Sequence, residues 1–150
     1  MATFLPDTSC MVAAVCAWHE RHRPARDEIE RRLDAGAVMI SAAPALVETY
    51  AVLTRLPSPH RLSPEDTLAL LESNFIRDVR LVALNGASYR ALLRGAPKEE
   101  IAGGRVYDAV IAECASSAGV DEILTFNDKD FAGFDKGFKV VVPGQPPKQS

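Results

Sequence analysis

The sequence has little of what marks a secreted, membrane-spanning or strongly cationic protein. It contains three cysteines and no Cys-x-x-Cys pair, so we expect neither a disulfide framework nor a zinc knuckle, and we expect a cytoplasmic protein. Its apolar runs are much shorter than the roughly 20 residues of a membrane span, and residues 1–6 lack the basic segment of a signal peptide. A net charge of −3 excludes a globally basic nucleic-acid binder, although it does not exclude a local basic patch.

The motifs of several enzyme classes are missing as well. There is no GxSxG elbow or Ser-His-Asp order for acyl transfer, and no GxxxxGKS/T or GxGxxG loop for a nucleotide. His19 and His22 are spaced like a metal-binding pair on a helix, but no further ligands follow nearby and arginines flank them. A solvated helix end, with at most a minor RNA contact, is the better interpretation.

What the chain does have is a regular alternation of strand-like and helix-like apolar periods. Its 47% hydrophobic and 25% charged residues are ordinary for a globular domain. The expected strands are 2–5, 38–42, 80–84, 122–126 and 139–142, and the expected helices are 11–18, 24–33, 45–56, 63–76, 87–94 and 106–117. This order predicts an α/β fold, a three-layer α/β/α domain over residues 1–143 with a mainly parallel five-stranded sheet, followed by a flexible tail at 144–150.

Polar residues follow two of the predicted strands. Asp7 follows the first strand, and Asn127 and Asp128 follow the fourth, which ends near Thr125. Asp108 lies in the first turn of the helix after Gly103–Gly104. Ligands of parallel sheets bind beyond the carboxyl ends of the strands, so these side chains are expected to converge. Taken singly, each acid also has a structural interpretation as a helix cap, a partner of a helix dipole or a turn residue.

Glu48 is harder to explain as a structural residue. It is the only charged residue between Ala42 and Thr54, within a nearly apolar helix. A carboxylate in such a setting costs stability unless it is paired, bound to a metal or exposed to a cavity. The alternative is a solvent-facing stripe that continues to Arg55.

Three acids in one pocket favour a bound cation. Two carboxylates about 5 Å apart repel by roughly 3 kcal/mol at an effective dielectric constant of about 20. Such a cluster therefore requires raised pKa values or a divalent cation. Carboxylate oxygens select Mg²⁺ or Mn²⁺ over zinc, and such a site suits phosphoryl chemistry with a metal-activated water.

Four segments in this order resemble the PIN-domain ribonucleases. They are PDTS after the first strand, the isolated Glu48, GGRVYDAVIAECA and ILTFNDKDF. The similarity is greatest to the VapC toxins of bacterial toxin–antitoxin pairs and runs from about Thr3 to Val142. It implies an endoribonuclease that depends on Mg²⁺ or Mn²⁺, a homodimer and inhibition by a small VapB-like antitoxin.

The resemblance also implies roles for individual residues. Asp7 and Asp108 match the acids that hold the metal, and Glu48 matches the family's second acid. Asn127 stands where the family often has an acid, so Asp128 is our candidate for the fourth acid, with Asp130 as the neighbouring alternative. The expected supporting residues are Thr8, Ser9, Thr125 and Asn127.

Basic residues near the acidic centre are candidates for RNA contacts, since a phosphate backbone needs cations around a negatively charged site. They are Arg90, Arg94, Lys98 and Arg105. A simple solvated face is the default interpretation of their spacing. A dimer is further suggested by aliphatic residues in excess of what one sheet would cover, namely Leu46, Leu53, Leu56, Leu68, Leu70, Leu71, Phe75 and Ile76.

Three other functions compete with a ribonuclease toxin. A housekeeping RNA-processing PIN nuclease would carry the same acids. An aspartyl phosphatase or phosphoreceiver domain would need a second acid beside Asp7, where Thr8 and Ser9 stand. A non-catalytic partner-binding module on this fold would not need Asp7, Glu48 and Asp108 together.

Overall fold

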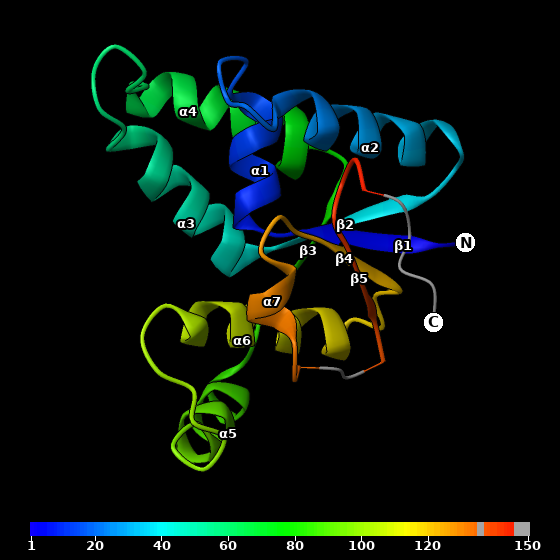
Figure 1. The fold of residues 1–150 in the computed structure, drawn as a ribbon, viewed down its shortest axis with the longest axis vertical. Helices are drawn as coiled ribbons and strands as arrows, with labels where there is room; N and C mark the ends of the chain where they lie inside the picture. Colours follow the sequence, from blue (N-terminus) through cyan, green and yellow to red (C-terminus); the bar gives the residue numbers. More distant parts are fainter. Residues whose placement is uncertain (135–136, 146–150) are drawn as a thin grey trace.

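The computed structural model describes residues 1–134 and 137–145. Within them lies the predicted parallel sheet between two layers of helices (Figure 1). The strands are β1 (Thr3–Pro6), β2 (Val38–Ala42), β3 (Arg80–Val82), β4 (Glu122–Leu124) and β5 (Lys139–Val141). The α/β/α prediction is therefore confirmed, whereas most of the predicted tail at 144–150 lies outside the described residues.

The strand order is β3-β2-β1-β4-β5, and all neighbours pair in parallel. The chain moves outward from β1 to β2 and β3, and then returns to the other side of β1 to form β4 and β5. The carboxyl ends of β1 and β4 therefore flank the point where the winding reverses. Open α/β sheets bind their ligands at this kind of switch point.

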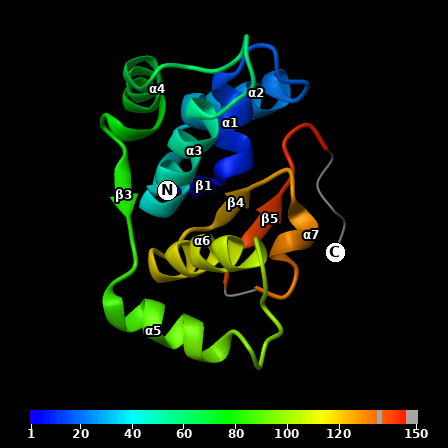
Figure 2. The same ribbon diagram turned by 90° about the vertical axis from the view of Figure 1, so that its left-hand side faces the viewer.

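The helices divide between the two faces of the sheet. One layer holds α1 (Thr8–Val15), α2 (His22–Asp34), α3 (Ala43–Thr54) and α4 (Pro64–Leu71). The opposite layer holds α5 (Gly86–Gly95), α6 (Arg105–Ser117) and the short α7 (Asp128–Phe131). Figure 2 shows α5 on the far side of α6 from the sheet, so α6 separates α5 from the first layer.

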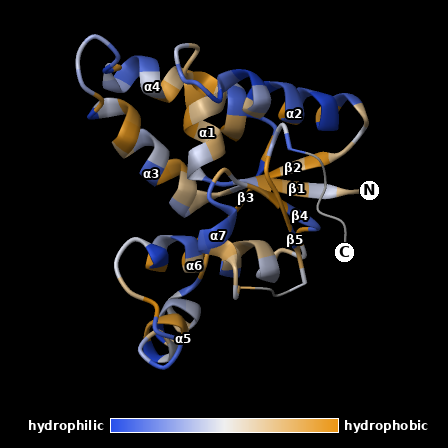
Figure 3. Ribbon diagram, in the orientation of Figure 1, coloured by the Kyte–Doolittle hydropathy of each residue, from blue (hydrophilic) through white to orange (hydrophobic). Residues whose placement is uncertain are grey.

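The core lies on both faces of the sheet. Phe4, Leu5, Ile123 and Leu124 on the two central strands are all buried. Figure 3 shows hydrophobic residues concentrated along the strands, whereas α2 is largely hydrophilic. Every helix among the described residues is too short or too polar to span a lipid bilayer.

Two predicted helices have different boundaries in the structure. Helix α1 begins at Thr8 rather than near residue 11, because the Asp7 side chain caps it and accepts a hydrogen bond from the Cys10 N–H (3.0 Å). It ends at Val15 rather than at residue 18, because the backbone is extended at Cys16. The predicted helix 63–76 is α-helical only to Leu71 and continues as a π-helical turn over Glu72–Ile76. In that turn the Asn74 side chain donates to a backbone carbonyl, which competes with regular helical bonding.

Helix α7 is a further difference, because the sequence predicted only a turn between β4 and β5. Its single turn, Asp128–Phe131, is too short to show a helical period in the sequence. The turn buries Phe131 against the core and carries two acids, the half-buried Asp128 and the exposed Asp130. This short helix therefore brings acidic side chains close to the end of β4.

The excess of exposed aliphatic side chains expected on α3, α4 and the turn after α4 is smaller than the sequence suggested. Leu46, Leu53, Leu71 and Phe75 are buried within the single chain, so they were wrongly counted as exposed surface. Helix α3 packs between α1 and α4, which the helical period alone does not show. The large apolar side chains that stay exposed on α3 and α4 are Val47, Tyr50 and Leu68. A homodimer stays a prediction, on that narrower surface.

Candidate active site

The first acid, Asp7, is held in place by a buried hydrogen-bond network. It follows β1 directly and is only 2% exposed. Its Oδ1 atom accepts bonds from the Ser9 hydroxyl (2.6 Å) and the Cys10 N–H (3.0 Å), and its Oδ2 atom accepts one from the Thr125 hydroxyl. Three of a carboxylate's roughly four acceptor positions are therefore filled by the protein. One acceptor position is left for a ligand.

The same network joins β1 to the end of β4. The Thr125 hydroxyl oxygen accepts a bond from the Asn127 N–H (2.9 Å), and the Ser9 hydroxyl oxygen accepts one from the Phe126 N–H (3.1 Å). Thr125 itself is fully buried. Ser9 and Thr125, which were predicted as supporting residues, therefore connect Asp7 to the backbone at the end of β4.

Burial raises the pKa of Asp7 above its ordinary value, and the charge of Glu48 raises it further. The hydrogen bonds from Ser9, Thr125 and the Cys10 N–H act in the opposite direction and only partly offset the burial. The ionised form of Asp7 therefore needs a positive charge nearby to stabilise it.

The pKa of Asp108 is raised as well. It lies in the first turn of α6 and is half-buried. Burial, together with the charges of three other acids, raises its pKa to about 7, and the charge of Arg105 acts in the opposite direction. The three acids are Asp130, Asp7 and Glu48. The acid after β1 and the acids of α3 and α7 therefore all act on Asp108, although they are far apart from it in the sequence.

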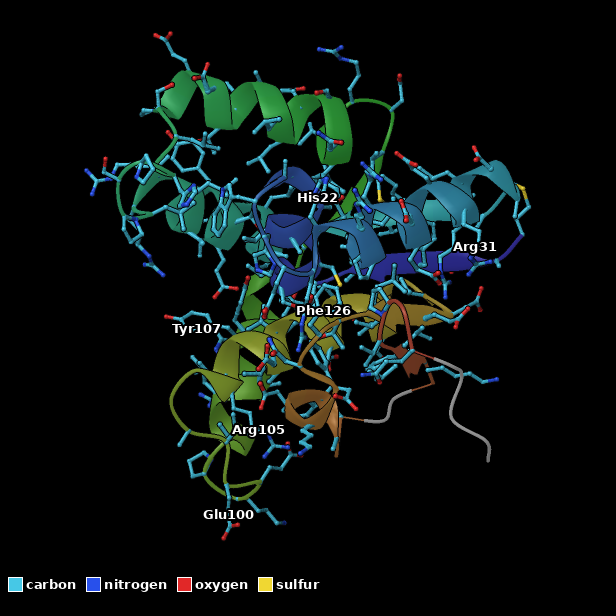
Figure 4. The ribbon with its side chains drawn as sticks, turned by 45° about the horizontal axis from the view of Figure 1, so that its top comes forward. His22, Arg31, Glu100, Arg105, Tyr107 and Phe126 are labelled. Carbon is cyan, nitrogen blue, oxygen red and sulfur yellow. The ribbon has the colours of Figure 1, made fainter. Side chains whose placement is uncertain are left out.

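A cleft of about 670 Å³ contains the three acids that the sequence singled out. Its walls come from α1, α3, α6 and the segments after α1 and β4. It is lined by Asp7, Thr8, Ser9, Val12, His19, Glu20, Arg21, Glu48, Val52, Gly104, Tyr107, Asp108, Phe126 and Asn127. Figure 4 shows Tyr107 and Phe126 between the two helical layers, where this cleft opens.

The acids of α7 are placed differently from the other three. Asn127 lines the cleft, whereas Asp128 and Asp130 come after Asn127 in the sequence and lie on α7. Asp130 is exposed, yet after burial its charge is the largest influence on the pKa of Asp108. The assignment of Asp128 as the fourth acid stays a prediction, and so does the alternative assignment of Asp130.

The predicted basic residues do not line this cleft. Arg90 and Arg94 lie on α5 and Lys98 follows it, on the far side of α6 (Figure 2). Arg105 donates to the Ala132 carbonyl (2.8 Å) and packs over the Phe134 ring, beside α7. Their role as RNA contacts stays a prediction, and Arg105 has a structural role in addition.

The segment after α1 also lines the cleft, a position that its sequence did not predict. Arg21 lines the cleft, donates to the Phe126 carbonyl (3.4 Å) and lies over the Phe126 ring, 4.9 Å from its centroid. His19 and Glu20 line the same wall. The basic run around Arg21 was a signal, but nothing in its spacing placed it opposite the end of β4.

The donor set fits a hard divalent cation. Mg²⁺ keeps several waters and typically takes one or two protein carboxylates, and Asp7 and Asp108 supply that number. The Thr8 hydroxyl, which also lines the cleft, is buried without a hydrogen-bond partner. Among residues 1–134 and 137–145, no three Asp, Glu, His or Cys side chains form a ready-made ligand cluster.

Comparison with known proteins agrees with the resemblance noted in the sequence. Residues 4–137 match the model of the PIN domain, so fold and site together define a PIN-domain protein. The chain is 42% identical over 120 residues to a protein named Ribonuclease VapC40 from Mycobacterium tuberculosis, a match that covers 80% of this chain and 83% of that relative. The chain therefore belongs to the VapC family of PIN-domain proteins.

Solved structures show the same fold at lower identity. One is Mycobacterium tuberculosis VapC20, described as a Sarcin-Ricin loop cleaving toxin, with a TM-score of 0.66, 20% identity, and coverage of 89% of this chain and 97% of that one. Another is VapBC-5 from the same organism, a member of the VapBC family of toxin-antitoxin systems, with a TM-score of 0.56, 20% identity, and coverage of 95% and 98%.

The raised pKa of Asp108 predicts a specific pH dependence of stability in metal-free protein. Between pH ~4 and about 7 the folded state holds a proton that the unfolded chain has released, so stability falls as the pH rises through this window. The asparagine side chain of the Asp108→Asn variant cannot ionise, so the variant does not lose stability in this way as the pH rises. We expect the free energy of unfolding of Asp108→Asn, relative to that of the wild type, to increase by about 1–2 kcal/mol from pH ~5 to pH ~8. The change is kept this small because solvent screens part of the repulsion at a half-buried group.

Urea unfolding with a chelator present measures this difference. Asp34→Asn, at an exposed acid at the end of α2, is the control for the removal of one surface carboxylate. A constant difference between Asp108→Asn and the wild type across the window would contradict the proposed carboxylate repulsion.

Proposed function

We propose that this chain is a metal-dependent endoribonuclease that acts as the toxin of a toxin–antitoxin pair. The observation that carries the proposal is the cleft that holds Asp7, Glu48 and Asp108 together at the switch point of the sheet. The similarity to Ribonuclease VapC40 supports RNA as the substrate. Carboxylates that raise one another's pKa values at a ligand-binding edge indicate a catalytic site.

Asp7 and Asp108 would hold Mg²⁺ or Mn²⁺. The metal would supply a more acidic bound water and would neutralise charge that develops on the phosphate. The ion would also offset the burial and repulsion that raise the pKa values of both acids.

The remaining residues position groups and move protons. Ser9 and Thr125 fix the orientation of the Asp7 carboxylate through their hydroxyl groups. Glu48, half-buried on the opposite wall, is proposed to accept a proton from the attacking water. Asn127 is proposed to orient that water, and Arg21 to contact the phosphate, because it is a cation on the wall of an acidic cleft.

The proposal includes partners and location. A VapB-like antitoxin would bind the toxin, as the solved VapBC-5 relative suggests. A homodimer would cover the exposed side chains of Val47, Tyr50 and Leu68. Three buried free cysteines are consistent with a reducing cytoplasm.

Replacing Asp7 tests the proposed reaction. Asp7→Asn keeps an acceptor for the Cys10 N–H but loses the negative charge, so we expect RNA cleavage to fall at least about 100-fold while the fold is retained. Mn²⁺ should raise the melting temperature of the wild type and not that of Asp7→Asn. Asp34→Asn, the surface control, should keep both responses. Full cleavage by purified Asp7→Asn protein would disprove the assignment.

A second comparison assigns the fourth acid. Asp128→Ala and Asp130→Ala remove neighbouring carboxylates of α7 in otherwise identical proteins. We expect the larger loss of cleavage from Asp130→Ala, because the charge of Asp130 is, after burial, the largest cause of the raised pKa of Asp108. A larger loss from Asp128→Ala would instead assign the role to Asp128, as the sequence pattern predicts. Cleavage rates at saturating Mn²⁺ separate the two.

A further inference from the structure

An exposed aromatic surface lies beside the cleft and has no role in the reaction described above. We define the aromatic platform as Trp18, in the segment between α1 and α2, and His60, in the segment between α3 and α4. Their rings stack with centroids 4.1 Å apart and an angle of 24° between the planes. Trp18 is nevertheless 49% exposed, so a large part of the indole remains open to a ligand.

The segment that carries Trp18 is rigidly held. The His19 N–H donates to the Cys16 carbonyl (2.9 Å), and the Arg21 N–H donates to Nδ1 of His19 (3.0 Å). One turn later, the His22 ring bonds to the Ala13 carbonyl (2.9 Å). The indole is therefore presented by a fixed turn, which lowers the entropy cost of binding a flat ligand.

The segment that carries His60 is held in the same way. The His60 N–H donates to the Pro57 carbonyl (2.9 Å), and the Leu62 N–H donates to the Leu53 carbonyl at the end of α3 (3.2 Å). The Arg61 side chain adds a bond to the Leu56 carbonyl (2.8 Å). Two separate loops are therefore fixed so that their aromatic rings meet.

The platform is continuous with the cleft through His19. The His19 ring lies 5.8 Å from the Trp18 ring, and His19 lines the cleft together with Asp7 and Glu48. Arg21, two residues further on, lines the same wall. An RNA chain with a phosphate at the acids would therefore pass a cation, Arg21, on the cleft wall and an aromatic surface next to that wall.

We propose that the aromatic platform binds an unpaired base of the RNA beside the cleaved phosphate, so that the substrate is single-stranded at this point. The inference rests on the proposed function. Every base has a flat face that stacks on an aromatic ring regardless of sequence, whereas a base inside a duplex has both faces already covered. The adjacent Arg21 and the acids account for the phosphate, and Trp18 and His60 account for the base.

The chain contains one tryptophan, so its fluorescence reports on the platform directly. With a chelator present to prevent cleavage, we expect a single-stranded oligoadenylate to quench Trp18 emission. The same sequence in a duplex should leave the emission unchanged. Binding without quenching would overturn the proposal.

Variants separate stacking from general binding. With a labelled oligoadenylate and an anisotropy readout, Trp18→Ala should weaken binding by about 5- to 100-fold, and Trp18→Phe should recover most of it. Tyr89→Ala, an exposed aromatic on α5 outside the cleft, is the matched control and should bind normally. Circular dichroism checks that each variant is folded. Equal binding by Trp18→Ala and Tyr89→Ala would overturn the proposal.

Other occupants of the platform give different results. If a second copy of the chain or an antitoxin covers it, Trp18 emission will change with protein concentration or with added antitoxin but not with RNA, and the proposal is wrong. The proposed function fails separately. In that case Asp7→Asn would cleave RNA like the wild type, whatever Trp18 does.

Discussion

The buried carboxylate of Asp7 is the interaction on which the rest of the site depends. It caps α1, and through Ser9 and Thr125 it fixes the backbone after β4. Two strands that are adjacent in the sheet but 118 residues apart in sequence are thereby tied at their carboxyl ends. This side-chain connection adds to the backbone pairing of the two strands and extends it to Phe126 and Asn127, which line the cleft.

The cluster is electrostatically unfavourable without a ligand. Burial raises the pKa of Asp7, and burial together with three other acids raises that of Asp108 to about 7. An ordinary core would replace such groups with apolar ones, because unpaired buried charges destabilise the folded state. Their presence at a binding edge is what a site prepared for a cation would show, with stability given up for function.

Most of the fold and the centre of the site could be predicted from the sequence, because both follow from local patterns. Alternating periods gave the parallel sheet, and a lone acid on an apolar helix identified Glu48. Residues 19–21 could not be placed, because their approach to Phe126 depends on how α1 packs against the sheet. For the same reason, the burial of Leu46 and Phe75 was misjudged, since a helical period does not show what covers each face.

The most direct test of the account is to locate a cation in the cleft. Anomalous scattering from crystals grown with Mn²⁺ would show where the ion binds. The account predicts a peak about 2–2.5 Å from carboxylate oxygens of both Asp7 and Asp108, with Glu48 facing it across the cleft. A map with no peak between these two acids at saturating Mn²⁺ would contradict the central claim.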